Sequence, residues 1–252
     1  MDLGLSGKRV LVTGGTRGIG RATVAAFLDE GAHVGFCART AEEVTATEAE
    51  MAARGRVRGS TVDVGDKDAL TTWVDESARA LGGLDVVVAS VSALAIPDTE
   101  ENWETSLNVD LMHTVRLVNT ALPYLTESDA ASVVAISSVS GRESDFASGP
   151  YGTAKTAIVG YIHGLALQLA DQGIRANTVS PGNTYFEGGI WATVEQDDPA
   201  LFGTAMGLNP TGRMGRPEES AVAVVFLASP RASRISGTNL VADGALTRGV
   251  QL

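Results

Sequence analysis

A phenol and an ammonium stand four residues apart in the stretch PYGTAKTAI (150–158), where Tyr151 precedes Lys155. Side chains four apart on a helix lie on one face, so the two groups can share a site. A free phenol has a pKa of about 10, and a nearby ammonium favours the phenolate and lowers that value. Such a tyrosine can give a proton to a carbonyl oxygen or take one from an alcohol. The pair alone is equally compatible with a surface tyrosine beside a lysine that extends to solvent.

Two further polar residues bear on that choice. Ser138 follows the apolar run SVVAIS (132–137), where a hydroxyl can hydrogen-bond a substrate oxygen that gains negative charge. Three other serines stand close by, so the pattern does not single out one of them: Ser137, Ser140 and Ser148. Asn108 lies in a helical pattern although asparagine is a mediocre helix former. Its amide can hold a water molecule or bind a backbone carbonyl, or it is an ordinary polar residue on a helix face.

The elements that must position these groups alternate between short apolar runs and longer helical patterns. Valine-rich runs predict buried strands at 9–13, 33–38, 57–64, 84–90, 132–137, 175–180 and 238–244. Helices are predicted at 18–30, 41–54, 66–81, 103–125, 151–172 and 217–228. This order predicts a single α/β domain over residues 1–252, with a doubly wound parallel sheet of about seven strands and helices on both faces. The stretch 181–216 breaks the rhythm, and we expect 183–210 to be an excursion that covers the substrate.

A glycine-rich turn, VTGGTRGIGRA (12–22), follows the first predicted strand and opens the first predicted helix. Gly14, Gly18 and Gly20 let the chain turn sharply and let backbone N–H groups approach a pyrophosphate at the helix N-terminus. The spacing G-x-x-x-G-x-G is weak evidence by itself, and a plain turn is the alternative. Its place between a strand and a helix favours a dinucleotide.

The second predicted strand ends without the carboxylate that NAD-binding folds often place there for the ribose 2′-hydroxyl. Arg39 stands at that point, and Arg17 projects from the glycine turn. Arginine binds phosphate in a planar, often bidentate way, so two guanidiniums suit a ribose 2′-phosphate. We therefore expect NADP(H) to be preferred over NAD(H); two solvated arginines are the alternative. Asp63 and Val64 close the third predicted strand, where an adenine can rest.

The composition excludes other classes of protein. The formal charge of −11 argues against nucleic acid or an anionic membrane as the main partner. Cys37 is the only cysteine and the three histidines are far apart in sequence, so we expect no disulfide and no metal site. The sequence shows no leader-like start and no run of about 18 apolar residues, and we expect a cytoplasmic protein without a membrane span.

These residues together resemble the short-chain dehydrogenase/reductase family, from the first strand to about Gly244. TGGTRGIG (13–20) is similar to its cofactor turn, YGTAK (151–155) to its Tyr-x-x-x-Lys motif, NVD (108–110) to its asparagine motif and NTVSPG (177–182) to its nicotinamide-side turn. The resemblance implies that Tyr151 is the acid/base, and that Lys155 binds ribose and lowers the tyrosine pKa. It implies that Ser138 positions the substrate oxygen and that Asn108 supports a proton-relay water.

The same resemblance implies a Rossmann-like domain and a set of cofactor contacts. These are Gly14, Thr16, Arg17, Gly18, Ile19, Gly20, Arg39, Asp63, Val64, Ala89, Tyr151, Lys155, Pro181, Gly182 and Thr184. One segment departs from the family pattern. After its fourth strand the family usually has Asn-Asn-Ala-Gly, and this chain has Ala-Ser-Val-Ser at 89–92. We expect a local rearrangement there, without loss of cofactor binding. The family's threonine after Pro-Gly is also displaced, and Thr184 is its nearest substitute.

The implied activity is hydride transfer between NADP(H) and a small-molecule carbonyl or secondary alcohol. Two alternatives stay open: a 3-oxoacyl-thioester (acyl-carrier-protein) reductase, with a basic patch at Arg213 and Arg216, and a catalytically silent nicotinamide-binding regulator. The excursion offers a partly apolar set of residues that either line a substrate pocket or pack the excursion down: Tyr185, Phe186, Ile190, Trp191, Leu201, Phe202 and Met206. The family also implies a homo-oligomer, a dimer or tetramer, through the helices at 103–125 and 151–172. The sequence does not identify the substrate, the direction of reaction or its stereochemistry.

Overall fold

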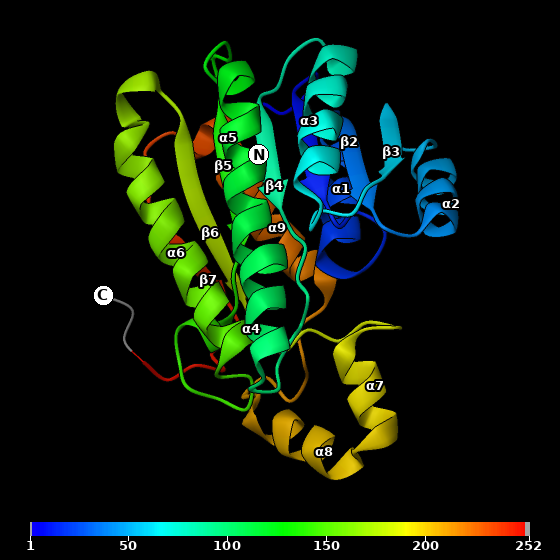
Figure 1. The fold of residues 1–252 in the computed structure, drawn as a ribbon, viewed down its shortest axis with the longest axis vertical. Coiled ribbons are helices and arrows are strands. Elements are labelled where there is room, and N and C mark those ends of the chain that lie inside the picture. Colours follow the sequence, from blue (N-terminus) through cyan, green and yellow to red (C-terminus); the bar gives the residue numbers. More distant parts are fainter. Residues whose placement is uncertain (1, 250–252) are drawn as a thin grey trace.

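The computed structural model describes residues 2–249, and its centre is a seven-stranded sheet in which all neighbouring strands are parallel (Figure 1). The spatial order is β3-β2-β1-β4-β5-β6-β7. The strands are β1 (Arg9–Thr13), β2 (His33–Ala38), β3 (Val57–Thr61), β4 (Val86–Ala89), β5 (Ser132–Ile136), β6 (Arg175–Pro181) and β7 (Asn239–Ala242). The strand order reverses between β1 and β4, and such a switch point opens a ligand crevice at the carboxyl edge of the sheet. The predicted doubly wound sheet is confirmed.

Helices cover both faces of this sheet (Figure 1). One face carries α3 (Lys67–Leu81), α5 (His113–Leu125) and α6 (Pro150–Gln168), and the other carries α1 (Gly18–Asp29), α2 (Ala41–Met51) and α9 (Pro217–Ala228). Each layer has its own apolar core, represented by Leu117 and Ile158 on the first face and by Phe27 and Val224 on the second. The central strands are buried on both sides, which is why they read as continuous apolar runs.

The long helix predicted at 103–125 consists of three consecutive segments. It begins as α4 (Glu100–Ser106), passes through the π-helical segment η1 (Leu107–Met112), and continues as α5. A π-helical turn holds more residues per turn than an α-helix, and it changes which side chains face the sheet. The segment η1 therefore sets the direction of the residues that the sequence placed in the asparagine motif.

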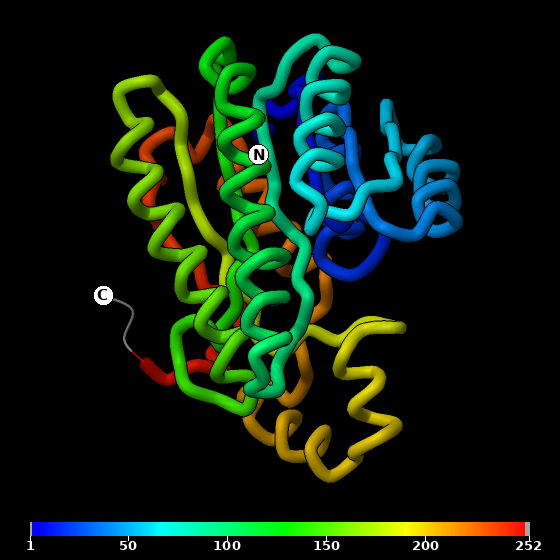
Figure 2. The backbone as a smooth tube through the Cα atoms, viewed as in Figure 1, coloured from blue at the N-terminus to red at the C-terminus, as the bar shows by residue number. Residues whose placement is uncertain are grey.

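The stretch after β6 forms two short helices, α7 (Ile190–Asp197) and α8 (Pro199–Leu208), at the bottom of Figure 1. The tube in Figure 2 shows this excursion leaving the body and returning to it as a hairpin-like loop. Its two ends are joined because Tyr185 N–H donates to the Gly215 carbonyl at 2.9 Å. Trp191, Ala205 and Met214 form a small separate core. The predicted excursion therefore forms a compact helical segment with its own small core at the carboxyl edge of the sheet.

The remaining helical turns are short 3₁₀ segments: η2 (Val139–Gly141), η3 (Ala170–Gln172) and η4 (Pro230–Ala232). Within residues 2–249, none of the helices combines the length and apolar character needed to cross a membrane. The same described range holds no cluster of three or more His, Cys, Asp or Glu side chains arranged for a metal ion.

Candidate active site

Ser138, Tyr151 and Lys155 come together at the carboxyl edge of the sheet. Ser138 follows β5 directly, and a loop from η2 leads to α6, which begins at Pro150. Gly149 precedes that helix with φ of 107°, a left-handed conformation that favours glycine. Because Tyr151 is in the first turn of α6 and Lys155 in the second, both lie near the strand end that carries Ser138.

The α6 helix packs against η2 with almost no space between the backbones. A Cβ atom added to Gly152 would lie 2.8 Å from the Ser140 carbonyl oxygen, and one added to Gly141 would lie 2.8 Å from the Lys155 carbonyl carbon. Any larger residue at these two positions would push the helix away. The two glycines therefore fix the distance between the serine segment and the tyrosine helix.

The structure distinguishes Ser138 from its neighbours. Ser137 donates its hydroxyl to the Lys155 carbonyl at 2.9 Å, and Ser140 donates to the Asp145 carboxylate at 2.6 Å. Ser148 accepts from the Asp145 backbone N–H. The Ser138 Oγ accepts from Ser140 N–H at 3.2 Å and lies beside the Tyr151 hydroxyl. Of these serines, Ser138 is the one placed to share a substrate oxygen with the tyrosine.

Tyr151 is half-buried, and the Lys155 Nζ lies 5.6 Å from the centre of its ring. Burial raises the pKa of Tyr151, while the Lys155 ammonium and a hydrogen bond with Ser138 lower it. The Asp110 and Asp145 carboxylates add to the raising effects, and the net direction is above the ordinary value. The predicted lowering by Lys155 is thus present, and in this structure the raising effect of desolvation of the phenolate is larger.

The Asn108 side chain does not point into this group, and its role in supporting a proton-relay water stays a prediction. Its amide donates to the Gly65 carbonyl at 3.1 Å, and its oxygen accepts from Arg116 at 2.8 Å. The side chain that reaches Lys155 from the same segment is Asp110, with Oδ1 3.1 Å from the lysine Nζ. Residues 108 and 110 are two apart and cannot face the same way on a helix. The π-helical segment η1 directs the carboxylate, and not the amide, toward the tyrosine helix.

The Ala-Ser-Val-Ser segment that follows β4 is held by a hydrogen-bonded chain through a buried histidine. Ser90 N–H donates to Thr13 Oγ1 at 3.0 Å, and the same hydroxyl is 3.0 Å from His113 Nε2. His113 Nδ1 is 2.7 Å from the Val109 carbonyl, which can only accept, so Nδ1 carries the proton. Burial lowers the pKa of His113 to about 4, which keeps the ring neutral. The imidazole joins β1, the segment after β4 and η1 where the family pattern has amides.

The glycine turn has the shape of a phosphate cradle. Gly14 and Gly18 have φ of 74° and 53°, and a Cβ atom added to Gly20 would lie 2.1 Å from the Gly14 carbonyl oxygen. The turn ends at Arg17, which precedes α1 without a side-chain cap, so the first N–H groups of the helix have no capping side chain. Thr16 and Ile19 are half-buried beside it. These features fit a dinucleotide pyrophosphate at the helix N-terminus.

The residues expected around the adenosine half lie on the same side of the molecule. Arg17 and Arg39 are exposed, and neither forms an ion pair with another residue between 2 and 249. Asp63 is exposed and accepts from Gly65 N–H. The Val64 side chain is 2% exposed and belongs to the core under α3 and α5, so only its backbone can meet an adenine. Thr16 donates to Glu43 at 3.1 Å, which brings one acid to this region.

The residues expected around the nicotinamide half follow β4 and β6. Ala89 is the last residue of β4 and is buried, and Pro181 ends β6. Gly182 packs against Asp243, where a Cβ atom would lie 2.8 Å from that residue's Cβ. Thr184 donates its hydroxyl back to the Gly182 carbonyl at 3.0 Å. The threonine therefore lies at the turn that the nicotinamide-side motif predicted, with its hydroxyl engaged locally.

The excursion contacts the cofactor turn through Phe186. A Cβ atom added to Gly18 would lie 2.6 Å from the Phe186 ring, so the ring rests on the glycine turn. Other predicted aromatics take part in two edge-on aromatic contacts. Trp191 is 5% exposed and packs edge-on against Phe146, while Tyr185 packs edge-on against Phe202. Part of the predicted pocket set thus holds the excursion together.

Sequence reasoning missed Asp110, although the pattern contained a signal for it. Residues three or four apart form one buried stripe along this helix: Asp110, Thr114, Leu117, Ala121 and Leu125. A carboxylate on a buried stripe needs a cation or several donors. No comparable signal in the sequence pointed to His113 or to the contact of Phe186 with Gly18.

Comparisons with known proteins agree with this arrangement. The family model described as "Enoyl-(Acyl carrier protein) reductase" matches residues 14–247. An isoepoxydon dehydrogenase from Penicillium expansum is 42% identical over 260 residues, covering 100% of this chain and 99% of the relative. A 3-oxoacyl-[acyl-carrier-protein] reductase from Thermotoga maritima is 32% identical over 248 residues, covering 96% and 98%. The crystal structure of a short chain dehydrogenase from Burkholderia cenocepacia in complex with NADP is 29% identical, with a TM-score of 0.88 and coverage of 96% and 99%.

Proposed function

Because the chain belongs to the short-chain dehydrogenase/reductase family, we propose that it is an oxidoreductase in which Tyr151 is the acid/base for a carbonyl or secondary alcohol. The observation that carries this proposal is the meeting of Ser138, Tyr151 and Lys155 at the carboxyl edge, next to a glycine turn that fits a dinucleotide. A bound nicotinamide supplies or accepts the hydride. The protein's own groups handle the proton and the geometry.

In the reductive direction Tyr151 gives its hydroxyl proton to the carbonyl oxygen, while the Ser138 hydroxyl holds that oxygen in place. Lys155 stabilises the phenolate that remains, because its ammonium lowers the pKa of Tyr151. In the oxidative direction the same phenolate takes the proton of the alcohol.

We infer a preference for NADP(H). The exposed guanidiniums of Arg17 and Arg39 lie where a ribose 2′-phosphate would approach the glycine turn and the end of β2. Arginine supplies the bidentate donors that a phosphate accepts. The relative from Burkholderia cenocepacia was solved with NADP. Glu43, which accepts from Thr16, is an acid of this region that opposes a second phosphate charge.

We infer that the substrate is a small secondary alcohol or ketone, and the relative from Penicillium expansum, which is named an isoepoxydon dehydrogenase, supports this inference. A 3-oxoacyl-thioester remains the alternative, since the relative from Thermotoga maritima is named for it. The basic patch that this alternative requires is weakened here. Arg213 is paired with Glu219, with Nη1 2.8 Å from Oε2, and the same carboxylate accepts from Arg216 N–H. This pairing favours the small-molecule substrate.

We also infer a cytoplasmic homo-oligomer that associates through α5 and α6. Gly152 is used within the chain, but a Cβ atom at Gly160 or Gly164 would have nothing within 4 Å. Leu167 on the same helix is 82% exposed. Small residues beside an exposed leucine allow the close approach of a second helix. Light scattering of the purified protein distinguishes monomer, dimer and tetramer.

The direct test is a panel of substrates with the purified protein. Isoepoxydon, simple cyclic ketones and their alcohols, and acetoacetyl-CoA are each offered with NADP(H) and NAD(H), and the absorbance of the reduced nicotinamide is followed. We expect turnover of ketones or alcohols with NADP(H). Turnover of acetoacetyl-CoA alone would establish the thioester alternative. Tight cofactor binding without turnover of any substrate would favour the silent regulator.

A further inference from the structure

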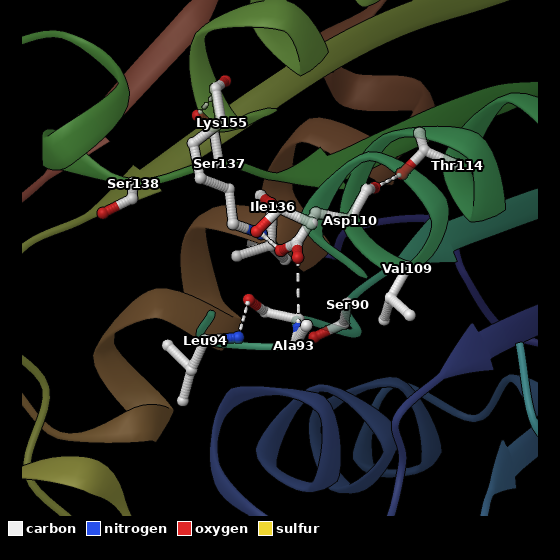
Figure 3. Close-up of polar contacts among 12 residues, drawn as sticks. Ser90, Ala93, Leu94, Val109, Asp110, Thr114, Ile136, Ser137, Ser138 and Lys155 are labelled. Atoms are coloured by element: carbon white, nitrogen blue, oxygen red, sulfur yellow. Dashed lines mark hydrogen bonds and ion pairs between the residues drawn. The ribbon is translucent and has the colours of Figure 1, made fainter. Parts of the chain in front are cut away.

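A buried carboxylate lies beside the lysine of the tyrosine site (Figure 3). Asp110 is fully buried and Lys155 is 2% exposed, and their Oδ1 and Nζ atoms are 3.1 Å apart. The ammonium also donates to the Ile136 carbonyl at 3.1 Å. The Oδ1 atom has no hydrogen-bond partner among residues 2–249, because the approach of Nζ meets the distance of an ion pair but not the angles of a hydrogen bond. Its attraction to the lysine is therefore mainly one of charge.

The position of Asp110 is determined on three sides. Its Oδ2 atom accepts from Ala93 N–H at 3.1 Å, which ties it to the segment that departs from the family pattern. Thr114 donates its hydroxyl to the Asp110 carbonyl at 2.9 Å. His113 lies three residues after Asp110, and its ring bonds to the Val109 carbonyl and to the Thr13 hydroxyl. It therefore fixes the backbone of η1 to β1. In Figure 3 the carboxylate points between Ala93 and the end of the Lys155 side chain.

We propose that Asp110 is a positioning residue that holds the Lys155 ammonium in the site and balances its charge. This inference rests on the proposed function, since it assigns the partner of the lysine that serves Tyr151. The Lys155 Nζ contacts the Ile136 carbonyl oxygen and the Asp110 carboxylate, and the rest of the lysine side chain is buried. The ammonium is therefore fixed at its distance from the Tyr151 ring, and does not need substrate or cofactor to order it.

The charge of Asp110 changes the pKa of Tyr151 electrostatically. The charged and polar groups that face the phenol are Lys155 on α6, Ser138 after β5, Asp110 on η1 and Asp145 in the loop before α6. Of these, both carboxylates raise the pKa of Tyr151. Removing the charge of Asp110 leaves the ammonium unbalanced and makes the phenolate easier to form. The Lys155 ammonium thus lowers the pKa of Tyr151, and Asp110 cancels part of that lowering.

The test is the pH dependence of kcat/KM in the Asp110→Asn variant, measured for alcohol oxidation and for carbonyl reduction. Asparagine keeps an acceptor for Ala93 N–H and removes the charge. Asp85→Asn is the matched control, because Asp85 is also a buried carboxylate in an ion pair, with Arg9, at the start of β4 and away from the site. Asp110→Ser is a second variant of smaller volume, in case the amide does not fit.

We expect the limb of both pH profiles that reports Tyr151 to move to lower pH in Asp110→Asn and Asp110→Ser, and to stay in place in Asp85→Asn. A profile of Asp110→Asn that coincides with the wild type, or that moves to higher pH, would overturn the inference. Tyr151→Phe is measured in parallel. If it keeps turnover, the proposed function fails; if it is inactive while the Asp110→Asn profile is unmoved, only this inference fails.

Discussion

Replacing Lys155 by methionine should destabilise the protein far more than an ordinary surface substitution does. Lys155 and Asp110 are 3% and 0% exposed by side chain, and methionine leaves the carboxylate buried without its cation. Removing one member of a buried ion pair costs about 3–5 kcal/mol. A domain of this size loses roughly 2–4 °C in Tm for each kcal/mol. The expected fall in Tm is therefore between about 6 and 20 °C.

Thermal unfolding followed by circular dichroism measures this loss, and the chain offers a matched control. Lys8 pairs with Asp129 at 2.7 Å, but the two side chains are 23% and 88% exposed. An exposed pair contributes about 0–1 kcal/mol, so Lys8→Met should lower Tm by no more than about 4 °C. The double variant Lys155→Met/Asp110→Asn removes both charges and keeps an acceptor for Ala93 N–H. It should be more stable than Lys155→Met.

The reasoning is refuted if Lys155→Met unfolds at the same temperature as Lys8→Met. It is also refuted if the loss in the double variant equals the sum of the two single losses, because that result means no coupling between the two side chains. Coupling of several kcal/mol with an intact fold supports the ion pair that the geometry shows.

Three further predictions follow from other parts of the structure. Arg39→Asp should lower kcat/KM for NADPH by about 10- to 100-fold, the effect of losing a charged hydrogen bond, and should favour NADH in steady-state assays; an unchanged preference would rule out the 2′-phosphate assignment. His113 has a folded pKa of about 4, below its ordinary value of about 6.5, so the unfolded chain binds the proton first. The free energy of unfolding should fall by about 3 kcal/mol as pH drops from about 6.5 to about 4, and urea titrations should find this slope missing in His113→Gln. Gly20→Ala places a Cβ 2.1 Å from the Gly14 carbonyl oxygen, and should weaken NADPH binding in fluorescence titration, while Gly160→Ala, with open space around it, should not.

Most of the fold was predictable because its strands are buried on both faces. Runs such as 9–13 and 33–38 are mostly apolar, and the structure begins and ends β1 and β2 at those residues. The excursion was predictable from its composition, but its two helices were not, since its small core depends on contacts such as that between Trp191 and Met214. A pattern of apolar residues gives the period of an element and does not give its tertiary partners.

The candidate site was predictable where helical spacing alone decides the geometry. Tyr151 and Lys155 are four residues apart on a regular helix, and the structure places them together. The direction of the Asn108 side chain could not be predicted, because the helix there contains a π-helical segment that no residue type in the sequence indicates. The net direction of the Tyr151 pKa could not be predicted, because an ammonium is visible in a sequence and burial is not. Both differences depend on packing between segments that are far apart along the chain.

The central claim, that Tyr151 transfers the proton, is tested most directly by Tyr151→Phe. Phenylalanine removes the hydroxyl and keeps the ring beside Lys155. Turnover of the best ketone is measured together with the Kd of NADPH for the wild type and the variant. We predict a loss of at least about 10²-fold in kcat, with the Kd nearly unchanged. A variant that turns over at the rate of the wild type would contradict the mechanism.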